Sequence, residues 1–216
     1  MDNQTISNVM PRIGDKAPDF EAVTTTGKLK FSDYNKGSWV VFFSHPADFT
    51  PVCTTEMSGF ATEKEFFAAH NTKLMGLSID SIHSHIAWVN AVHEKTGVLF
   101  EFPIVADIDM SVSKLYGMLQ PGESETAAVR AVFIMDPEGK VRLIMYYPLN
   151  VGRNMAEIKR TVLALQTSDE NKCAMPLDWQ PGDKVIVPAP KTVEALAERK
   201  KSDLEMVDWY LAKRSL

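Results

Sequence analysis

Short apolar runs alternate along the chain with longer segments of helical spacing, a pattern typical of an α/β fold. Four of these runs are predicted strands, at residues 38–44, 73–80, 131–136 and 141–147. The first three are apolar throughout, as expected of strands that are covered on both faces of a sheet. The sequence DPEG, residues 136–139, separates the last two runs and is a turn signal. These two strands are therefore predicted to form a β-hairpin.

Apolar residues spaced three and four apart predict helices at about 54–69, 82–95 and 154–166. Ser81 or Asp80 is a plausible N-cap for the second helix, because serine and aspartate accept hydrogen bonds from the first free N–H groups. Near the amino terminus, the sequence GDKAPDFEAVTTTGKLKFSDY predicts a short strand, a glycine turn and a second strand.

The character of the sequence changes near residue 168. The following stretch is rich in proline and polar residues and predicts an extended arm or linker. After it, helical spacing predicts an amphipathic helix with apolar positions at Val193, Leu196, Ala197, Leu204, Val207 and Leu211. We expect a main domain of residues 1–167 and a carboxyl-terminal extension of residues 168–216. The extension has too little core to stand alone, so it should pack on the main domain or on a second subunit.

Composition narrows the possible functions. The 216 residues are 45 % hydrophobic, enough for one sizeable core and a small appended unit. The net charge is −5 without a block of like charge, which gives no electrostatic case for binding nucleic acid or a membrane surface. We expect no secretory signal and no membrane span, because no sufficiently long apolar run is present. The two cysteines form no disulfide framework and no CxxC pair, which favours a reducing compartment, by default the cytoplasm.

The first cysteine lies in the stretch SHPADFTPVCTTE, residues 44–56, between the first predicted strand and the first predicted helix. This order places Cys53 at or near the first helical turn, where unpaired N–H groups and the helix dipole stabilise a thiolate. Pro46 and Pro51 restrict the backbone, and Thr50 brings a hydroxyl close to the sulfur. Cys53 could instead be a small buried inert thiol, but its place at a helix start favours a nucleophile.

A stabilised thiolate does not by itself account for fast chemistry, because the nucleophilicity of a thiol falls as its basicity falls. Hydrogen-bond donors aimed at the atom that the thiolate attacks and at the leaving group must supply the rest of the rate enhancement. The best candidate for a cationic donor is Arg130, at the start of the strand predicted for 131–136, because α/β sheets gather their sites at strand ends.

The stretch resembles the active-site signature of the peroxiredoxins, Pro-x-x-x-Thr-x-x-Cys, matched here by Pro46, Thr50 and Cys53. The preceding SH and the following TTE resemble the one-cysteine-type branch of that family. The resemblance continues through SIDSIHSHIAWVNAV, FPIVAD, VRAVFIMDPEGKVR, YYPLNVGRNMAEI and PLDWQPGDKVIVPAP, and so covers nearly the whole chain.

The resemblance implies a thioredoxin-like fold, a central mixed sheet flanked by helices, and a cysteine-based peroxidase that needs no metal and no other cofactor. Cys53 would be the peroxidatic cysteine, which attacks the peroxide O–O bond and becomes a sulfenic acid. Thr50 and Arg130 would orient and polarise the peroxide, Pro46 would shield the sulfenate, and Glu56 would hold Arg130.

In the branch that the chain resembles, His45 sits near the sulfur and Arg153 is a second arginine near the site. The resemblance also implies a homodimer in which the extension of one subunit lies across the other subunit's site, with dimers often forming a decamer. An external thiol would act as reductant, whether thioredoxin-like, glutathione-like or of another kind.

Cys173 lies in the predicted arm, outside any site pattern. It is either a bystander, the reading that we favour, or a resolving cysteine that forms a disulfide with Cys53 of the same or a partner chain. Two other function classes compete with the peroxidase. One is a redox sensor or chaperone-like oligomer that Cys53 oxidation switches, and the weaker one is a thioredoxin-type oxidoreductase, for which the chain lacks a CxxC motif.

Overall fold

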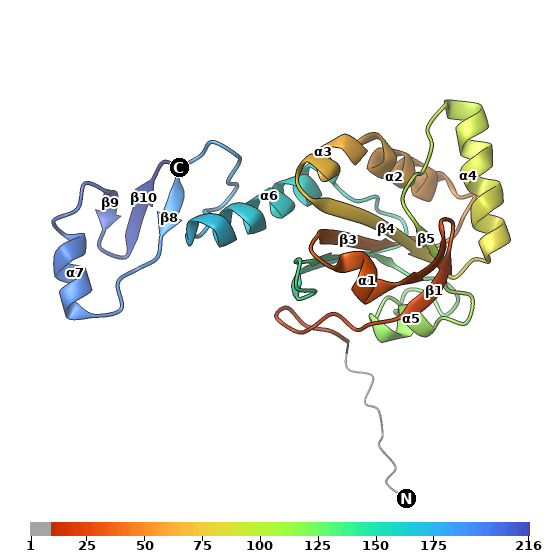
Figure 1. Ribbon diagram of the computed structural model, residues 1–216, viewed down its shortest axis with the longest axis horizontal. Helices are drawn as coiled ribbons and strands as arrows, with labels where there is room; N and C mark the ends of the chain where they lie inside the picture. Colours follow the sequence, from red (N-terminus) through yellow and green to blue (C-terminus); the bar gives the residue numbers. More distant parts are fainter. Residues whose placement is uncertain (1–9) are drawn as a thin grey trace, which may run out of the picture. The chain divides into compact units, whose positions relative to one another are not determined.

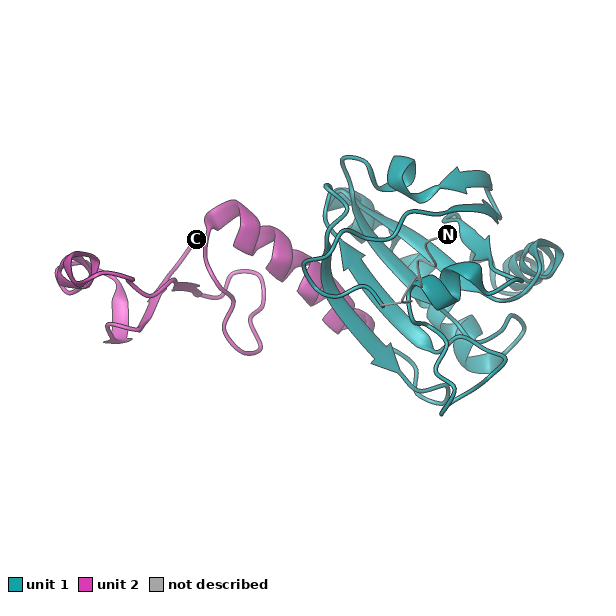
Figure 2. Cartoon of the chain, turned by 90° about the horizontal axis from the view of Figure 1, so that it is seen from below, with its two compact units in different colours: residues 1–153 teal, residues 154–216 magenta. Residues whose placement is uncertain are grey.

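A fully buried strand, β3 (Trp39–Ser44), lies inside a seven-stranded mixed sheet in the computed structural model, which describes residues 10–216. The chain forms two units, one ending at Arg153 and one spanning Asn154–Leu216 (Figure 2). The strands of the first unit are β1 (Glu21–Thr24), β2 (Gly27–Lys30), β3, β4 (Thr72–Ser78), β5 (Ile104–Ala106), β6 (Arg130–Met135) and β7 (Val141–Tyr147). Its helices are α1 (Phe31–Asn35), α2 (Pro51–Thr62), α3 (Lys64–Ala69), α4 (Ile82–Thr96) and α5 (Ser111–Leu115) (Figure 1).

The sheet has the strand order β2-β1-β5-β4-β3-β6-β7. Strands β3, β4 and β5 run parallel to their neighbours in this group, whereas β6 pairs antiparallel with both β3 and β7. The thioredoxin-like α/β fold expected from the sequence is confirmed. The placement of β6 beside β3 matters for function, because it brings the start of β6 to the end of β3 from which the cysteine loop leaves.

Alternate residues of β3 pack on opposite faces of the sheet. On one face, the ring of Phe42 packs edge-on against Tyr116 at 5.1 Å between centroids and contacts Phe31 of α1. On the other face, Phe43 stacks on Phe60 of α2 with the centroids 3.8 Å apart. The apolar run that predicted this strand is therefore explained, since helices cover both of its faces (Figure 1).

Most elements agree with the prediction. The β6–β7 hairpin turns at residues 136–139, where Gly139 has a φ of +75° and an added Cβ would lie 2.7 Å from the Asn35 side chain. Ser81 caps α4 by accepting a hydrogen bond from the Ser84 N–H group, as expected. The helix predicted at 54–69 is two helices, α2 and α3, that meet at Glu63. It also begins three residues earlier than predicted, because Pro51 suits the first helical position, where no N–H group is needed.

The second unit contains α6 (Met155–Asn171), β8 (Val185–Val187), α7 (Val193–Arg199), β9 (Glu205–Asp208) and β10 (Leu211–Arg214). The boundary predicted between residues 167 and 168 lies inside α6, because this helix extends five residues beyond its predicted end at 166. Cys173, Trp179 and Val185 form a small buried cluster in this unit. None of the helices described for residues 10–216 combines the length and apolar character that crossing a membrane requires.

The amphipathic helix predicted after residue 192 is wrong beyond Arg199. Residues 205–208 and 211–214 are strands that pair with each other, and β10 also pairs with β8. The chain turns at Ser202, whose hydroxyl donates a hydrogen bond to the Arg199 carbonyl. Pairing on both sides of β10 satisfies its backbone and buries Ala212 completely. The spacing of Leu204, Val207 and Leu211 fits a helix by coincidence.

The aromatic packing of β3 gives a first testable prediction. Phe42→Ala should lower the free energy of unfolding by about 3–5 kcal/mol, because it leaves a cavity between Tyr116 and Phe31. Val23→Ala, which truncates an exposed strand residue, should lower it by about 1 kcal/mol or less. Urea unfolding followed by circular dichroism would measure both changes, and equal losses in the two variants would contradict this account of the core.

Candidate active site

The loop between β3 and α2 places Cys53 at the third residue of the helix. Thr50 occupies the N-cap position with extended backbone, and its hydroxyl donates to the Ala47 carbonyl at 2.8 Å instead of capping the helix. The Cys53 side chain is 0 % exposed. It lies in the first helical turn, where N–H groups have no intrahelical partner and the helix dipole favours a negative charge. The structure thus places Cys53 at the start of a helix, the position that the sequence predicted.

Arg130 reaches this sulfur from the start of β6. Its Nη1 lies 3.3 Å from the Cys53 Sγ and donates a second hydrogen bond to the Glu56 Oε2 at 2.7 Å. Its Nε and Nη2 both donate to the Leu149 carbonyl, at 2.9 and 2.6 Å. The guanidinium is buried and held at both ends, so it presents a fixed positive charge and a directed N–H group at the sulfur.

Glu56 joins this arginine to a second one. The Arg153 Nε donates to the Glu56 Oε1 at 2.9 Å and its Nη2 donates to the Oε2 at 2.7 Å, a bidentate pair that the Arg153 backbone N–H reinforces at 2.7 Å. The Nη1 of Arg153 donates to the carbonyls of Ser44 and Ala131, at 2.8 and 3.0 Å. Arg153 thus ties α2 to the ends of two neighbouring strands.

The pKa of Glu56 reflects this environment. Burial would raise it, but the charge and hydrogen bonds of Arg153 and the charge of Arg130 outweigh burial, so the pKa lies below its ordinary value. Glu56 is therefore ionised at neutral pH. Its single negative charge lies between two guanidinium groups, which leaves one positive charge unbalanced beside the Cys53 sulfur.

Behind the loop, His45 is fully buried and its Nε2 lies 2.9 Å from the Asp48 Oδ1. Burial lowers the pKa of His45, although hydrogen bonding and charge from Asp48 oppose this effect. The other carboxylate oxygen of Asp48 lies 2.7 Å from the Nδ1 of His85, a residue of α4. The ring of His45 packs against Trp88, whose indole N–H donates to Thr54.

Sequence reasoning missed Asp48 and His85. Both occur in quoted stretches, Asp48 inside SHPADF and His85 inside SHIAW, but no spacing in the sequence indicates that the two side chains meet. Pro46 lies half-buried in the loop that precedes α2. The structure thus brings together Cys53 with Arg130, and Glu56 with Arg130 and Arg153, as described above.

Cys173 belongs to the second unit and is also buried. Its Sγ lies 3.9 Å from the Thr167 carbonyl, and its neighbours in the small cluster are Trp179 and Val185. No charged group contacts this sulfur among the hydrogen bonds described for it. A thiol in such apolar surroundings is poorly reactive until the cluster opens.

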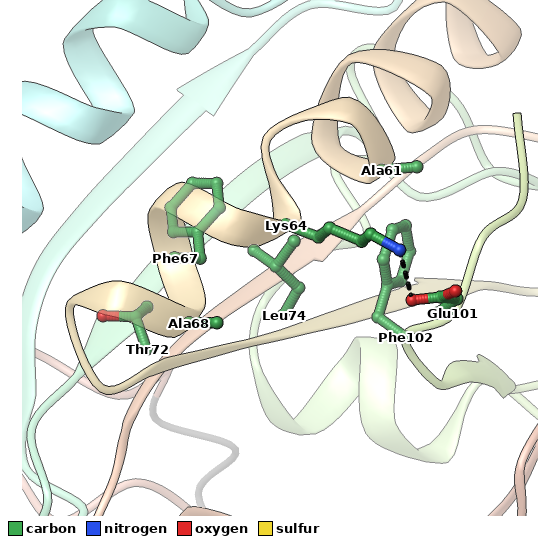
Figure 3. A pocket seen from close by; sticks show the side chains of 8 residues that line it. All are labelled: Ala61, Lys64, Phe67, Ala68, Thr72, Leu74, Glu101 and Phe102. Atoms are coloured by element: carbon green, nitrogen blue, oxygen red, sulfur yellow. Dashed lines mark hydrogen bonds and ion pairs between the residues drawn. The ribbon is translucent and has the colours of Figure 1, made fainter.

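Two surface pockets differ in whether they lie beside Cys53. A pocket of about 170 Å³ beside α3 has apolar walls and an exposed ion pair between Lys64 and Glu101, with no nucleophile (Figure 3). A larger apolar hollow of about 690 Å³ includes Thr50 and Thr54 in its wall, at the start of α2. Only the second hollow adjoins the helical turn that carries Cys53.

Comparisons with known proteins identify the family of this chain. Residues 13–144 match the AhpC/TSA family, and residues 164–202 match the C-terminal domain of 1-Cys peroxiredoxin. A peroxiredoxin of Methanosarcina mazei is 54 % identical over 211 residues, which cover 94 % of this chain and 96 % of that protein. A peroxiredoxin of Aquifex aeolicus is 50 % identical over 217 residues, covering 96 % of this chain and 98 % of that protein.

Two solved structures share the fold. A yeast mitochondrial 1-Cys peroxiredoxin, whose thiol is resolved via glutathione/thioredoxin systems, superposes with a TM-score of 0.87 at 42 % identity, covering 96 % of this chain and 100 % of that one. A mutant of Peroxiredoxin 6 of Arenicola marina gives a TM-score of 0.84 at 37 % identity, covering 94 % and 97 %.

A sulfur at a helix start, with an arginine donor and a thioredoxin-like sheet behind it, defines the class of thiol-dependent peroxidases. The chain belongs to the AhpC/TSA family and, within it, to the one-cysteine-type peroxiredoxins. The resemblance read from the sequence is confirmed.

The buried pairing of Glu56 gives a second prediction. Glu56→Gln should lower the free energy of unfolding at pH 7 by about 3–5 kcal/mol, because it leaves Arg130 and Arg153 buried without a counter-charge. The pKa of Glu56 is depressed in the folded protein, so the stability that its charge supplies is complete above about pH 4.3 and is lost as pH falls through the folded value. The difference between wild type and variant should therefore shrink in acid.

Denaturant titrations at a series of pH values would test this. Glu101→Gln is the matched control, because Glu101 pairs with Lys64 at 2.8 Å on the surface and should contribute about 1 kcal/mol or less. If Glu56→Gln lowered the free energy of unfolding by as little as the control does, the proposed pairing of Glu56 with two buried arginines would be contradicted. A loss of free energy that did not change with pH would contradict it too.

Proposed function

We propose that Cys53 is the peroxidatic nucleophile of this peroxiredoxin. One observation carries the proposal: the Sγ of Cys53 lies in the first turn of α2 and 3.3 Å from the Nη1 of Arg130, whose guanidinium is fixed by Glu56 and the Leu149 carbonyl. This arrangement provides a stabilised thiolate and a directed donor on the same reacting centre.

In the proposed reaction, the thiolate attacks the terminal oxygen of a hydroperoxide. An S–O bond forms while the O–O bond breaks, so sulfur is oxidised by two electrons and the peroxide is reduced by two. The proton of the attacked oxygen passes to the other oxygen, which leaves as water or an alcohol, and Cys53 remains as the sulfenate, the ionised form of the sulfenic acid. Arg130 stabilises the negative charge that develops on the two oxygens, and the Thr50 hydroxyl orients the peroxide. The apolar hollow beside Thr50 supports organic hydroperoxides as substrates together with hydrogen peroxide.

The remaining residues of the proposed site act on these groups. Glu56 holds Arg130, and Arg153 holds Glu56 while donating to the Ser44 carbonyl. Pro46, half-buried in the loop, would shield the sulfenate from solvent. His45 is a supporting residue of the proposed site, and its buried ring is oriented by the hydrogen bond to the Asp48 carboxylate.

We propose that an external thiol resolves the Cys53 sulfenic acid. The first thiol would form a mixed disulfide and release water, and a second thiol would release Cys53 as a thiol. The burial of Cys173 in its apolar cluster supports a bystander role for that residue. The yeast relative resolved via glutathione/thioredoxin systems supports a reductant of one of these kinds.

The chain is proposed to act as a homodimer, with a decamer as the larger assembly expected from the resemblance. Support comes from apolar side chains that the second unit leaves exposed, among them Leu177 at 91 % and Val193 at 78 %. The extension of residues 168–216 is the proposed source of these dimer contacts. A cytoplasmic location remains the prediction made from cysteine usage.

Cysteine variants provide the decisive prediction. Wild-type protein supplied with a thiol reductant should consume many equivalents of peroxide per chain, and Cys173→Ala should match it, whereas Cys53→Ser should be inactive. Stopped-flow kinetics and intact mass would measure turnover and the single added oxygen. If Cys53→Ser retained peroxidase activity, the proposal would fail. A single oxidation per chain with a change in assembly size would instead favour the redox-sensor alternative.

Arg130→Lys separates charge from geometry. Lysine keeps the positive charge but cannot donate to Cys53, Glu56 and the Leu149 carbonyl together, so we expect Cys53 oxidation to slow by at least about 100-fold. Arg142→Lys is the matched control, because Arg142 lies on β7 and pairs with Asp136 in the hairpin turn, so this substitution should leave the rate unchanged. Stopped-flow measurement of the rate constant with hydrogen peroxide would decide, and equal rates for the two variants would count against a directed donor.

A further inference from the structure

A buried charged cluster lies behind the loop that precedes α2. It consists of His45, Asp48 and His85, whose side chains are at most 1 % exposed. Asp48 lies between the two rings, with one carboxylate oxygen 2.9 Å from the His45 Nε2 and the other 2.7 Å from the His85 Nδ1. The backbone N–H of Asp48 donates to the Asp80 carboxylate at 3.0 Å, which fixes the loop at this point.

Both ring nitrogens of His85 face hydrogen-bond acceptors. The Nδ1 faces the Asp48 carboxylate, and the Nε2 lies 3.1 Å from the Val105 carbonyl. A carbonyl cannot donate a proton, so the Nε2 must carry one. The pKa of Asp48 lies below its ordinary value, because hydrogen bonds and charge from both histidines outweigh its burial. The Nδ1 thus faces an ionised carboxylate and the Nε2 faces a carbonyl, which is the arrangement of a ring that donates from both nitrogens.

The ring of His45 has the opposite character. Its Nε2 donates to Asp48, while its Nδ1 is buried and has no hydrogen-bond partner. A buried polar atom without a partner destabilises the fold, so its presence calls for a reason. Burial lowers the pKa of His45, which favours a neutral ring with a bare lone pair on Nδ1.

We propose that His85 is a positioning residue of the peroxidase site. The doubly protonated ring of His85 keeps Asp48 ionised. The Asp48 carboxylate in turn accepts the single proton of His45, which fixes that proton on the His45 Nε2. The His45 Nδ1 therefore remains an acceptor for a proton-bearing group that enters the reaction. The inference rests on the proposed function of Cys53. The ring of His45 packs against Trp88, and the Trp88 indole N–H donates to Thr54, the residue after Cys53, so Trp88 connects the His45 ring to the turn that carries the sulfur.

The same three side chains have the donor types of a metal site, and they are the one such group among the described residues. The hydrogen bonds favour the proton network. Each His–Asp contact is at hydrogen-bond length, and the side chains leave almost no exposed surface on which an ion could keep a solvent or substrate ligand.

Nitrogen-15 NMR of histidine-labelled, full-length protein at neutral pH would test the proton positions directly. Solid-state spectra of sedimented protein avoid any limit set by oligomer size. We expect two protonated nitrogens on His85, and on His45 a protonated Nε2 with a bare Nδ1. A single proton on His85, or a proton on the Nδ1 of His45, would overturn the proposal. So would one equivalent of tightly bound metal per chain in elemental analysis of the purified protein.

A substitution tests the functional consequence. His85→Asn retains an N–H donor for Asp48 but removes the positive charge. The charged groups that act on His45 are Asp48, His85 and Arg153, and the His85 charge opposes its protonation. Without that charge the pKa of His45 should rise. The rate of Cys53 oxidation should then fall about tenfold per pH unit below the new value, and return toward the wild-type rate at higher pH.

His83→Asn is the matched control, because His83 is exposed on the same helix and should leave the pH profile unchanged. A purely structural role for His85 would lower the rate equally at every pH, and parallel profiles for wild type and His85→Asn would overturn the proposal. The two proposals fail in different ways. Parallel pH profiles would contradict only the role of His85, whereas peroxidase activity in Cys53→Ser would contradict the proposed function. If His85→Asn did not fold, the NMR measurement on the wild type would still decide.

Discussion

The Glu56 carboxylate, held between two buried guanidinium groups, is the interaction on which the site depends. It joins three segments that are distant in sequence: helix α2, the start of β6, and the residues after β7. It also sets the local charge. Two arginines and one glutamate leave a single positive charge, which a Cys53 thiolate would neutralise. This unbalanced positive charge supports the proposal that Cys53 attacks as a thiolate.

The sheet supplies the geometry that the charges require. Antiparallel pairing aligns Phe43 of β3 with Val132 of β6, so the end of β3 and the start of β6 lie at the same edge. The Ser44 hydroxyl fastens this edge by donating to the Val129 carbonyl and accepting from the Ala131 N–H. The loop that carries the cysteine and the strand that carries Arg130 thus have little freedom to separate. Such preorganisation lets a donor act on a reacting atom without prior rearrangement.

The sequence predicted the elements of this arrangement that depend on short stretches of the chain. Apolar runs identified β3, β4, β6 and β7, and the loop-to-helix transition identified the position of Cys53. The pairing of His85 with Asp48 was not predicted, because it depends on how α4 packs behind the loop and on a Val105 carbonyl that no side-chain pattern reveals. The strands after Arg199 were mistaken for helix because a few apolar residues fit both periods, and only pairing with β8 decides between them.

In the proposed cycle, the complete burial of the Cys53 sulfur places different demands on the peroxide and on the reducing thiol. A small peroxide needs only a narrow opening to reach the sulfur, whereas a thiol carried on a larger molecule needs room for its own backbone or substituents. The ends of a helix open at a lower free-energy cost than its middle, so opening of the first turn of α2, near Pro51, would provide that room. The lifetime of the oxidised enzyme then depends on how often this turn opens, and a stiffer turn would leave the sulfenic acid exposed for longer to a second peroxide.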